Sequence, residues 1–334
     1  MEKLSNNAGL SLAMAVWLAH DEYTNGAAQH PGKNLISATS LLKSTRSIVL
    51  SHRMPQVDGT TDVSDLIPSR FGHAMHDSIE KAWTEGYEQA MLRLGLPKKM
   101  IDKVRINPDP SEITEDMITV FLEQRFFKPV FIDGNEVVVS GKFDQVINGE
   151  INDTKTTSVW AYVNRTKDED HKKQLSIYRW LCPEYIQSDV AKIQFIFTDW
   201  QRAMVRANKN YPASRVVEYN LELLSERETE KFVKEKIREI AMAQDMEEED
   251  LPPCTPKELW MSDPVYKYYA NPEKAKDPKA RSTRNFDTYP EAAQHCSKAG
   301  KGVVITVESE AKACGYCAAS PICSQYKALQ KAQS

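Results

Sequence analysis

The chain has 334 residues, which is enough for one large domain or two modest ones. Apolar residues make up 41% of it and charged residues 27%, the usual composition of a globular protein with a sizeable core. The net charge of -4 excludes an all-over basic surface for nucleic acid, but it leaves room for a basic groove.

The first third of the chain has a helical pattern. Its longest apolar run, residues 10–19, is too short to span a bilayer, and no signal-peptide cleavage site follows. We therefore expect a buried helix and an intracellular, cytoplasmic protein without a membrane segment. Ser37 is a possible N-cap for an amphipathic segment within residues 35–52, and the polar residues 53–68 read as a loop. A long helix is predicted for residues 69–94.

The apolar pattern then changes to the period of strands. Turn signals stand at Asp133-Gly134-Asn135 and Asn148-Gly149. The predicted strands cover residues 118–127, 129–132, 136–146, 150–155 and 191–199, with another possible at 215–219, and the later helices cover 174–181 and 221–246. The last segment is polar and rich in lysine, with one possible strand at 303–307. We expect three regions: residues 1–68, a core at 69–250, and a cysteine-rich tail at 251–334.

The stretch GKFDQVINGEINDTK, residues 141–155, combines two aspartates and a lysine. Asp144 is expected on its first strand, with Asp153 and Lys155 on the second. Residues two apart on a strand share a face, so Lys155 should lie beside Asp153. One or two carboxylates suffice to hold Mg²⁺, and phosphodiester hydrolysis needs such a cation. A bare Asp-x-Lys is most often a solvated turn, as we expect for the copies at 170–172 and 277–279.

Further motifs surround this stretch. They are GHAMH at 72–76, GKFD at 141–144, INDTK at 151–155 and QLSIY at 174–178. In this order the motifs resemble the PD-(D/E)XK nucleases of the RecB and Cas4 type, over roughly residues 35–200. The resemblance implies an α/β fold whose central mixed β-sheet is flanked by helices.

The resemblance also implies roles for individual residues. The metal ligands would be His76, Asp144, Asp153 and the carbonyl of Thr154, and the catalytic lysine would be Lys155. Gln174 and Tyr178 would hold the active site or contact the DNA backbone. Glu123 could be a secondary metal group. Without the family context, His76 reads as a packing residue, and His73 is a weaker candidate ligand.

The cysteines of the tail form a second motif. Cys314, Cys317 and Cys323 have the spacing C-x₂-C-x₅-C, which suits a metal ion or a cluster. The spacing resembles the C-terminal iron–sulfur staple of Cas4-like and AddB-like nucleases, which implies a [4Fe–4S] cluster, with Zn²⁺ as the alternative. Relatives have a fourth cysteine upstream, but residues 43–46 of this chain contain none. The candidates for the fourth ligand are Cys254, which we favour, and Cys296, whereas Cys182 reads as a core residue.

These expectations combine into a Mg²⁺- or Mn²⁺-dependent DNA exonuclease for recombination, end processing or replication, plausibly of a phage and then in the host cytoplasm. No nucleotide-binding loop is present, so work on long duplexes would need a helicase, recombinase or single-strand-binding partner. The alternatives are a catalytically silent nucleic-acid-binding subunit and a structure-specific or RNA-directed endonuclease. DNA contacts could come from basic residues around the site and at 272–284, and from the aromatic rings of Trp160, Tyr162 and Trp180.

Overall fold

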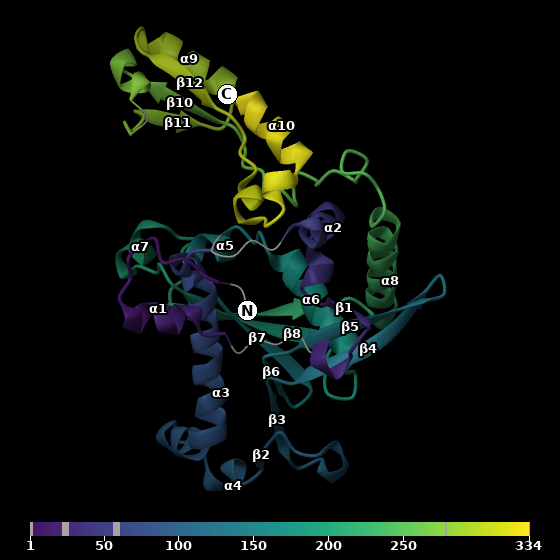
Figure 1. Ribbon diagram of the computed structural model, residues 1–334. Helices are drawn as coiled ribbons and strands as arrows, with labels where there is room; N and C mark the ends of the chain where they lie inside the picture. The colour runs from purple at the N-terminus through teal and green to yellow at the C-terminus, as the bar shows by residue number, and fades with distance from the viewer. Residues whose placement is uncertain (1–2, 22–26, 56–60, 278, 334) are drawn as a thin grey trace. The chain divides into compact units, whose positions relative to one another are not determined.

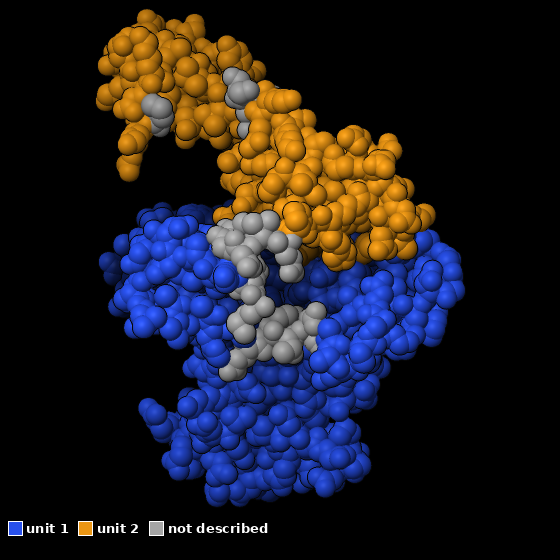
Figure 2. All heavy atoms as spheres, viewed as in Figure 1, with its two compact units in different colours: residues 1–42, 56–238 blue, residues 43–55, 239–334 orange. Residues whose placement is uncertain are grey.

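A computed structural model describes residues 3–21, 27–55, 61–277 and 279–333 (Figure 1). Part of the predicted loop, residues 56–60, and Pro278 within the third Asp-x-Lys copy lie outside the described residues. The chain forms two compact units (Figure 2). The first unit contains residues 1–42 and 56–238, and the second contains residues 43–55 and 239–334. The three regions expected from the sequence stay a prediction.

The first unit is built on a mixed six-stranded sheet in the order β2-β3-β6-β7-β8-β9. Pairs β2/β3 and β7/β8 are parallel, and the other neighbours are antiparallel. The strands are β2 (Val104–Ile106), β3 (Ile118–Leu122), β6 (Gln145–Ile147), β7 (Glu150–Thr157), β8 (Val190–Phe197) and β9 (Val216–Glu222). Every second residue of β8 is buried, as the alternation of apolar residues in its sequence predicts.

A second sheet of this unit has the order β1-β5-β4, with β1 (Asn34–Ser37), β4 (Arg125–Ile132) and β5 (Asn135–Lys142). The turn between β4 and β5 has positive φ at Asp133 and Gly134, +49° and +83°, and the turn between β6 and β7 has +49° at Asn148 and +79° at Gly149. Two successive positive φ values are the mark of a two-residue hairpin turn. Both predicted turns are confirmed.

Helices flank these sheets. They are α1 (Leu12–Ala19), α3 (Ile67–Arg93), α4 (Lys98–Ile101), α5 (Val159–Val163), α6 (Asp168–Leu181) and α7 (Arg202–Ala207), while α8 (Glu226–Ala243) runs from the first unit into the second. Short 3₁₀ turns are η1 (Ala27–Gln29), η2 (Ser40–Leu42), η3 (Val63–Leu66) and η4 (Pro110–Glu112). Helix α3 packs against β7, and α6 packs against β4, β5 and β9. The fold is therefore the predicted α/β arrangement of a mixed sheet between helices.

Several local predictions were wrong. The Asp-x-Lys copy at residues 170–172 is not a solvated turn but lies half-buried within α6 (Asp168–Leu181). The helix predicted from the first apolar run is present as α1, but only Leu18 of it is buried. Ser37 ends β1 and is not a helix N-cap; Ser44 has that role for α2 (Thr45–Arg53), where its side chain accepts from the N–H of Ser47. Asp144 is not on a strand but in the connection between β5 and β6, because the chain leaves one sheet there and enters the other.

The second unit contains more regular structure than its sequence pattern suggested. Strand β12 (Val303–Val307) is the predicted one, and it pairs with β10 (Val265–Tyr269), which also pairs with β11 (Arg284–Phe286). The unit also has α9 (Tyr289–Ala299), α10 (Ser324–Gln333), η5 (Pro272–Lys276), η6 (Lys312–Tyr316) and η7 (Ser320–Ile322). None of the helices in the described ranges has both the length and the apolar character needed to cross a membrane.

Candidate active site

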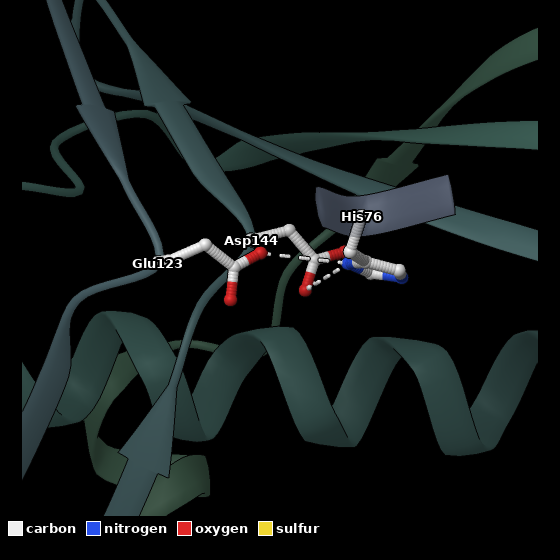
Figure 3. A group of neighbouring side chains, drawn as sticks. All are labelled: His76, Glu123 and Asp144. Atoms are coloured by element: carbon white, nitrogen blue, oxygen red, sulfur yellow. Dashed lines mark ion pairs between the residues drawn. The ribbon is translucent and has the colours of Figure 1, made fainter. Parts of the chain in front are cut away.

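Three elements bring a histidine and two carboxylates together in the first unit. His76 projects from α3, Glu123 follows the end of β3, and Asp144 lies between β5 and β6. The Nδ1 atom of His76 is 3.4 Å from Oδ1 of Asp144 and 3.6 Å from Oε1 of Glu123 (Figure 3). In the part of the chain that the structure describes, this is the one group of three or more such side chains whose ligand atoms lie within 4.8 Å of one another. An imidazole and two carboxylates can hold a divalent metal ion.

Backbone contacts position the two acidic residues. The N–H of Thr154 on β7 donates to Oδ2 of Asp144 at 3.0 Å. The N–H of Glu123 donates to the carbonyl oxygen of Asp144 at 2.8 Å, so the two acidic residues are tied through the main chain. Glu123 has a φ of +50°, a conformation that non-glycine residues rarely adopt and that is often found at functional sites.

The charges of His76 and Asp144 depend on each other. Burial lowers the pKa of His76, but hydrogen bonds to Asp144 and Glu123 outweigh it and raise the pKa to about 10. Burial raises the pKa of Asp144, and the hydrogen bond to His76 and the nearby charge of Lys155 outweigh it, so the net shift is downward. The two carboxylates thus favour the protonated form of the imidazole beside them.

Asp153 and Lys155 form an ion pair on β7. The Nζ atom of Lys155 lies 2.8 Å from Oδ2 of Asp153 and donates to Oδ1 at 2.9 Å. Oδ2 is buried and is held by this ion pair. Burial lowers the pKa of Lys155, but attraction by Asp153 and Asp144 raises it above its ordinary range, so Lys155 stays a cation. Burial raises the pKa of Asp153 to about 6.

Helix α6 presents Gln174 and Tyr178 to the same region. Nε2 of Gln174 donates to the hydroxyl of Tyr178 at 2.8 Å. Burial raises the pKa of Tyr178, and the charges of Asp153 and Asp144 raise it further, whereas the charge of Lys155 lowers it. A Cβ atom at Gly141 of β5 would lie 2.7 Å from Cδ1 of Tyr178, so only glycine allows α6 to approach this strand.

The structure places the predicted residues in two groups. His76 and Asp144 meet, but the third member of their group is Glu123, for which the sequence suggested only a secondary role. Asp153 is paired with Lys155 instead. Thr154 lines a small cavity with His76, Glu123 and Asp144, and the role of its carbonyl stays a prediction. The sequence placed Glu123 inside the strand predicted at 118–127, whereas β3 ends at Leu122 and Glu123 follows it directly.

The sequence pattern of the PD-(D/E)XK nuclease superfamily matches residues 39–324. The chain belongs to this superfamily. Among solved structures, SSO0001 is 15% identical, with 69% of this chain and 87% of SSO0001 covered and a TM-score of 0.40. A phage-related exonuclease from Haemophilus somnus 129PT is 11% identical, with 71% and 91% covered and a TM-score of 0.29. No curated protein matches.

The second unit of this PD-(D/E)XK nuclease contains a small cavity of about 30 Å³ lined by four cysteines, Cys254, Cys314, Cys317 and Cys323. Burial, followed by the neighbouring thiols, raises the pKa of Cys314 to about 11. These thiols do not form a group with all sulfur atoms within 4.8 Å, which is the spacing that one shared ion would need. Cys296 is on α9 and does not line this cavity, and Cys182 is buried in the first unit, where its Sγ contacts the carbonyl of Tyr178.

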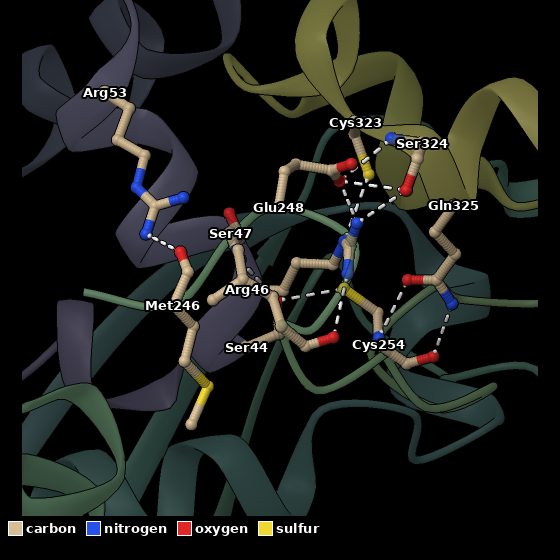
Figure 4. A network of polar contacts seen from close by, with 11 residues as sticks. Ser44, Arg46, Ser47, Arg53, Met246, Glu248, Cys254, Cys323, Ser324 and Gln325 are labelled. Carbon is tan, nitrogen blue, oxygen red and sulfur yellow. Dashed lines mark hydrogen bonds and ion pairs between the residues drawn. The ribbon is translucent and has the colours of Figure 1, made fainter. Parts of the chain in front are cut away.

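Polar side chains at the start of α2 contact these cysteines (Figure 4). The Oγ atom of Ser44 is 3.1 Å from Sγ of Cys254, and Nε of Arg46 donates to Sγ of Cys323 at 3.4 Å. Residues 43–46, where the resemblance implied a fourth cysteine, instead supply a hydroxyl and a guanidinium to the thiols.

Proposed function

We propose that this nuclease is a Mg²⁺- or Mn²⁺-dependent DNA exonuclease. The observation that carries the proposal is the group of His76, Glu123 and Asp144 next to the buried pair of Asp153 and Lys155. Hard carboxylate oxygens favour Mg²⁺ or Mn²⁺ over softer metals, and one imidazole is compatible with either. The donor set therefore fits the cation that the superfamily uses.

The residues of the site would share the work of hydrolysis. When bound, the cation neutralises charge on the phosphate and makes a water molecule more acidic. His76, Asp144 and Asp153 would hold the cation, with Glu123 as a fourth side chain and the carbonyl of Thr154 as a further ligand. Asp153 and Asp144 raise the pKa of Lys155, which favours its ammonium form; this ammonium would stabilise negative charge or orient the attacking water.

The proposed cellular role is the processing of DNA ends. An enzyme without a nucleotide motor would act at DNA ends made accessible by another protein, such as a helicase, recombinase or single-strand-binding protein. Recombination, end processing or replication, in a phage-infected cell or another cytoplasm, would supply such ends. A catalytically silent binding subunit would have no need for the complete set of Asp144, Asp153 and Lys155, and this favours the enzyme.

A nuclease assay tests the proposal. End-labelled single- and double-stranded DNA is incubated with Mg²⁺ or Mn²⁺, and closed circular DNA of the same sequence is the control for internal cutting. Linear DNA should be degraded and circles should survive, and Asp153→Ala and Lys155→Ala should each lose at least about 100-fold in rate. Cutting of circles would make the protein an endonuclease. Equal residual activity in wild type and both variants would contradict catalysis at this site.

We also propose that Cys254, Cys314, Cys317 and Cys323 hold a structural [4Fe–4S] cluster. Support comes from their thiolate chemistry and from the cavity that the four side chains line. Zn²⁺ is the alternative. Anaerobically purified protein should be brown and show the charge-transfer absorption of such clusters at about 400 nm. Colourless protein with stoichiometric zinc would favour the alternative. Cys254→Ser should lose the bound cluster or ion, and Cys296→Ser, which lies outside the cavity, is its matched control.

A further inference from the structure

A cavity of about 480 Å³ adjoins the candidate metal site within the first unit. One end of it is lined by the candidate ligands and acidic residues, namely His76, Asp77, Glu80, Glu123 and Asp144, and by Lys142, which forms an ion pair with Glu123. The other end is lined by Trp17, His20, Arg70 and His73. Its volume is in the range of sites for small molecules, about 300–1,000 Å³. The cavity therefore has space for a ligand that reaches from the metal site to an aromatic and basic end.

The aromatic end is formed by α1, whose apolar side chains are unusually exposed. Trp17 is 40% exposed, and Leu12, Met14 and Val16 are exposed as well. An exposed tryptophan that lines a cavity offers a flat apolar surface, and DNA bases stack on such surfaces whatever their sequence. The exposed indole of Trp17 could therefore contact a ligand in the cavity.

Arg70 holds this end in place. It is buried, and its Nε donates to the carbonyl oxygen of Leu18 at 2.8 Å, which fixes the end of α1. Nη2 is 3.1 Å from Oδ2 of Asp21, and Nη1 is 3.3 Å from Nδ1 of His73. A guanidinium has no acceptor atom, so Nδ1 of His73 must accept this bond. A neutral His73 then carries its hydrogen on Nε2, which makes the ring a donor in the cavity wall.

We propose that this cavity binds one unpaired nucleotide of a DNA strand beside the scissile phosphate, with its base stacked on Trp17 and a sugar or phosphate oxygen accepting a hydrogen bond from His73. The proposal rests on the proposed function, because the acidic end would repel a phosphate unless a cation were bound there. It adds a substrate preference: the strand end must be unpaired for its base to reach the indole.

A fluorescent base tests the stacking. A single-stranded oligonucleotide with 2-aminopurine at its terminal position is titrated with the full-length protein, with Ca²⁺ in place of Mg²⁺ to suppress cleavage. Trp17→Phe keeps a ring, Trp17→Leu keeps apolar bulk without one, and Trp260→Leu alters a tryptophan of similar exposure that belongs to the second unit and does not line the cavity. We expect quenching by wild type, Trp17→Phe and Trp260→Leu, and about ten-fold weaker binding by Trp17→Leu, because stacking on an aromatic ring contributes in this range per base.

The outcomes separate this proposal from the proposed function. Equal quenching and affinity for wild type and Trp17→Leu would overturn the subsite, even if the protein degrades DNA. An equal loss in Trp17→Phe and Trp17→Leu would also overturn it, because bulk rather than stacking would then matter. A wild type that quenches through Trp17 but cuts no DNA with Mg²⁺ or Mn²⁺ would retain the nucleotide subsite and refute the nuclease proposal.

Discussion

The ammonium of Lys155 lies 2.8 Å from a carboxylate oxygen of Asp153, two residues earlier on the same face of β7. Asp153 is only 1% exposed, so its charge depends on this partner. A buried ion pair contributes little net stability, but the removal of one partner leaves an uncompensated charge and is strongly destabilising. Lys155 thus supports the folded site as well as its chemistry.

The first prediction separates these two roles. Lys155→Met should lower the free energy of unfolding by about 3 kcal/mol, because the carboxylate of Asp153 loses its partner. The double variant Asp153→Asn, Lys155→Met should recover most of this loss while it stays inactive. Urea denaturation in the presence of a chelator measures both values. A double variant as unstable as the single one would contradict the charge argument.

The second prediction concerns the approach of α6 to β5. A Cβ atom at Gly141 would lie 2.6 Å from Cδ1 of Leu181, well inside van der Waals contact. Gly141→Ala should therefore cost about 2 kcal/mol and lower activity, since Tyr178 must move with α6. Gly86→Ala on α3 is the control: no atom lies within 4 Å of its Cβ position, and alanine should stabilise that helix by about 1 kcal/mol. Equal stability of both variants would contradict this explanation.

The third prediction concerns His171 on α6. Burial lowers its pKa to about 4, and its Nδ1 has no hydrogen-bond partner in the described structure. In the unfolded chain the imidazole has a pKa of about 6.5. Between the folded and the unfolded pKa the unfolded state therefore binds more protons, so the free energy of unfolding falls as the pH falls. Wild type should lose about 2 kcal/mol from this group between about pH 7.5 and pH 5.

His171→Phe should remove that loss, because a phenyl ring does not titrate and suits the neighbouring Phe195 ring. Other titrating groups act alike in both proteins and cancel in the comparison. Urea denaturation at the two pH values gives the difference. Parallel pH profiles for wild type and His171→Phe would show that the imidazole is not the source.

The sequence predicted local relationships better than distant ones. The spacing of Asp153 and Lys155 placed them on one face, because strand periodicity alone decides it. The meeting of His76 with Asp144 was implied only by the resemblance, since no local pattern relates a helix to a connection 68 residues away in the chain. Asp144 was predicted on a strand because residues 136–146 read as one run, whereas in the structure this segment contributes strands to two different sheets.

Other failures came from burial. The apolar residues of α1 predicted a buried helix, yet apolar composition does not say which surface covers it, and Trp17 faces a cavity. In the second unit, β10 was missed because its sequence VYKYY carries a lysine at the centre of a short strand. Tyr268 is nevertheless buried there against His295 of α9, a contact between segments far apart in the chain.

The fourth prediction assigns the ligand histidine. His76→Ala should weaken Mn²⁺ binding by about 100-fold, because it removes one ligand of a small donor set. His73→Ala, one helical turn earlier, should leave Mn²⁺ affinity nearly unchanged, since its ring contacts Arg70 instead. Isothermal titration with Mn²⁺ measures both. The reverse order of affinities would move the metal site along α3.

The fifth prediction concerns Arg46, which is 3% exposed in the second unit. Its Nη1 donates to the carbonyl of Leu251 at 2.9 Å, and its Nη2 contacts Glu248 and donates to Ser324 at 2.9 Å. Arg46→Ala would leave the carboxylate and the carbonyl without their donor, so we expect a loss of about 3 kcal/mol. Arg46→Lys should recover only part of it, because one ammonium cannot reproduce the planar fork.

Arg53 on α2 provides the control for Arg46. It is exposed, and its Nη2 donates to the carbonyls of Gln244 at 3.0 Å and Met246 at 2.6 Å, which water can also solvate. Arg53→Ala should therefore cost about 1 kcal/mol or less. Thermal denaturation and the rate of proteolysis after residue 239 compare the variants. If Arg46→Ala is no less stable than Arg53→Ala, the guanidinium is not what joins α2 to the cysteine segment within this unit.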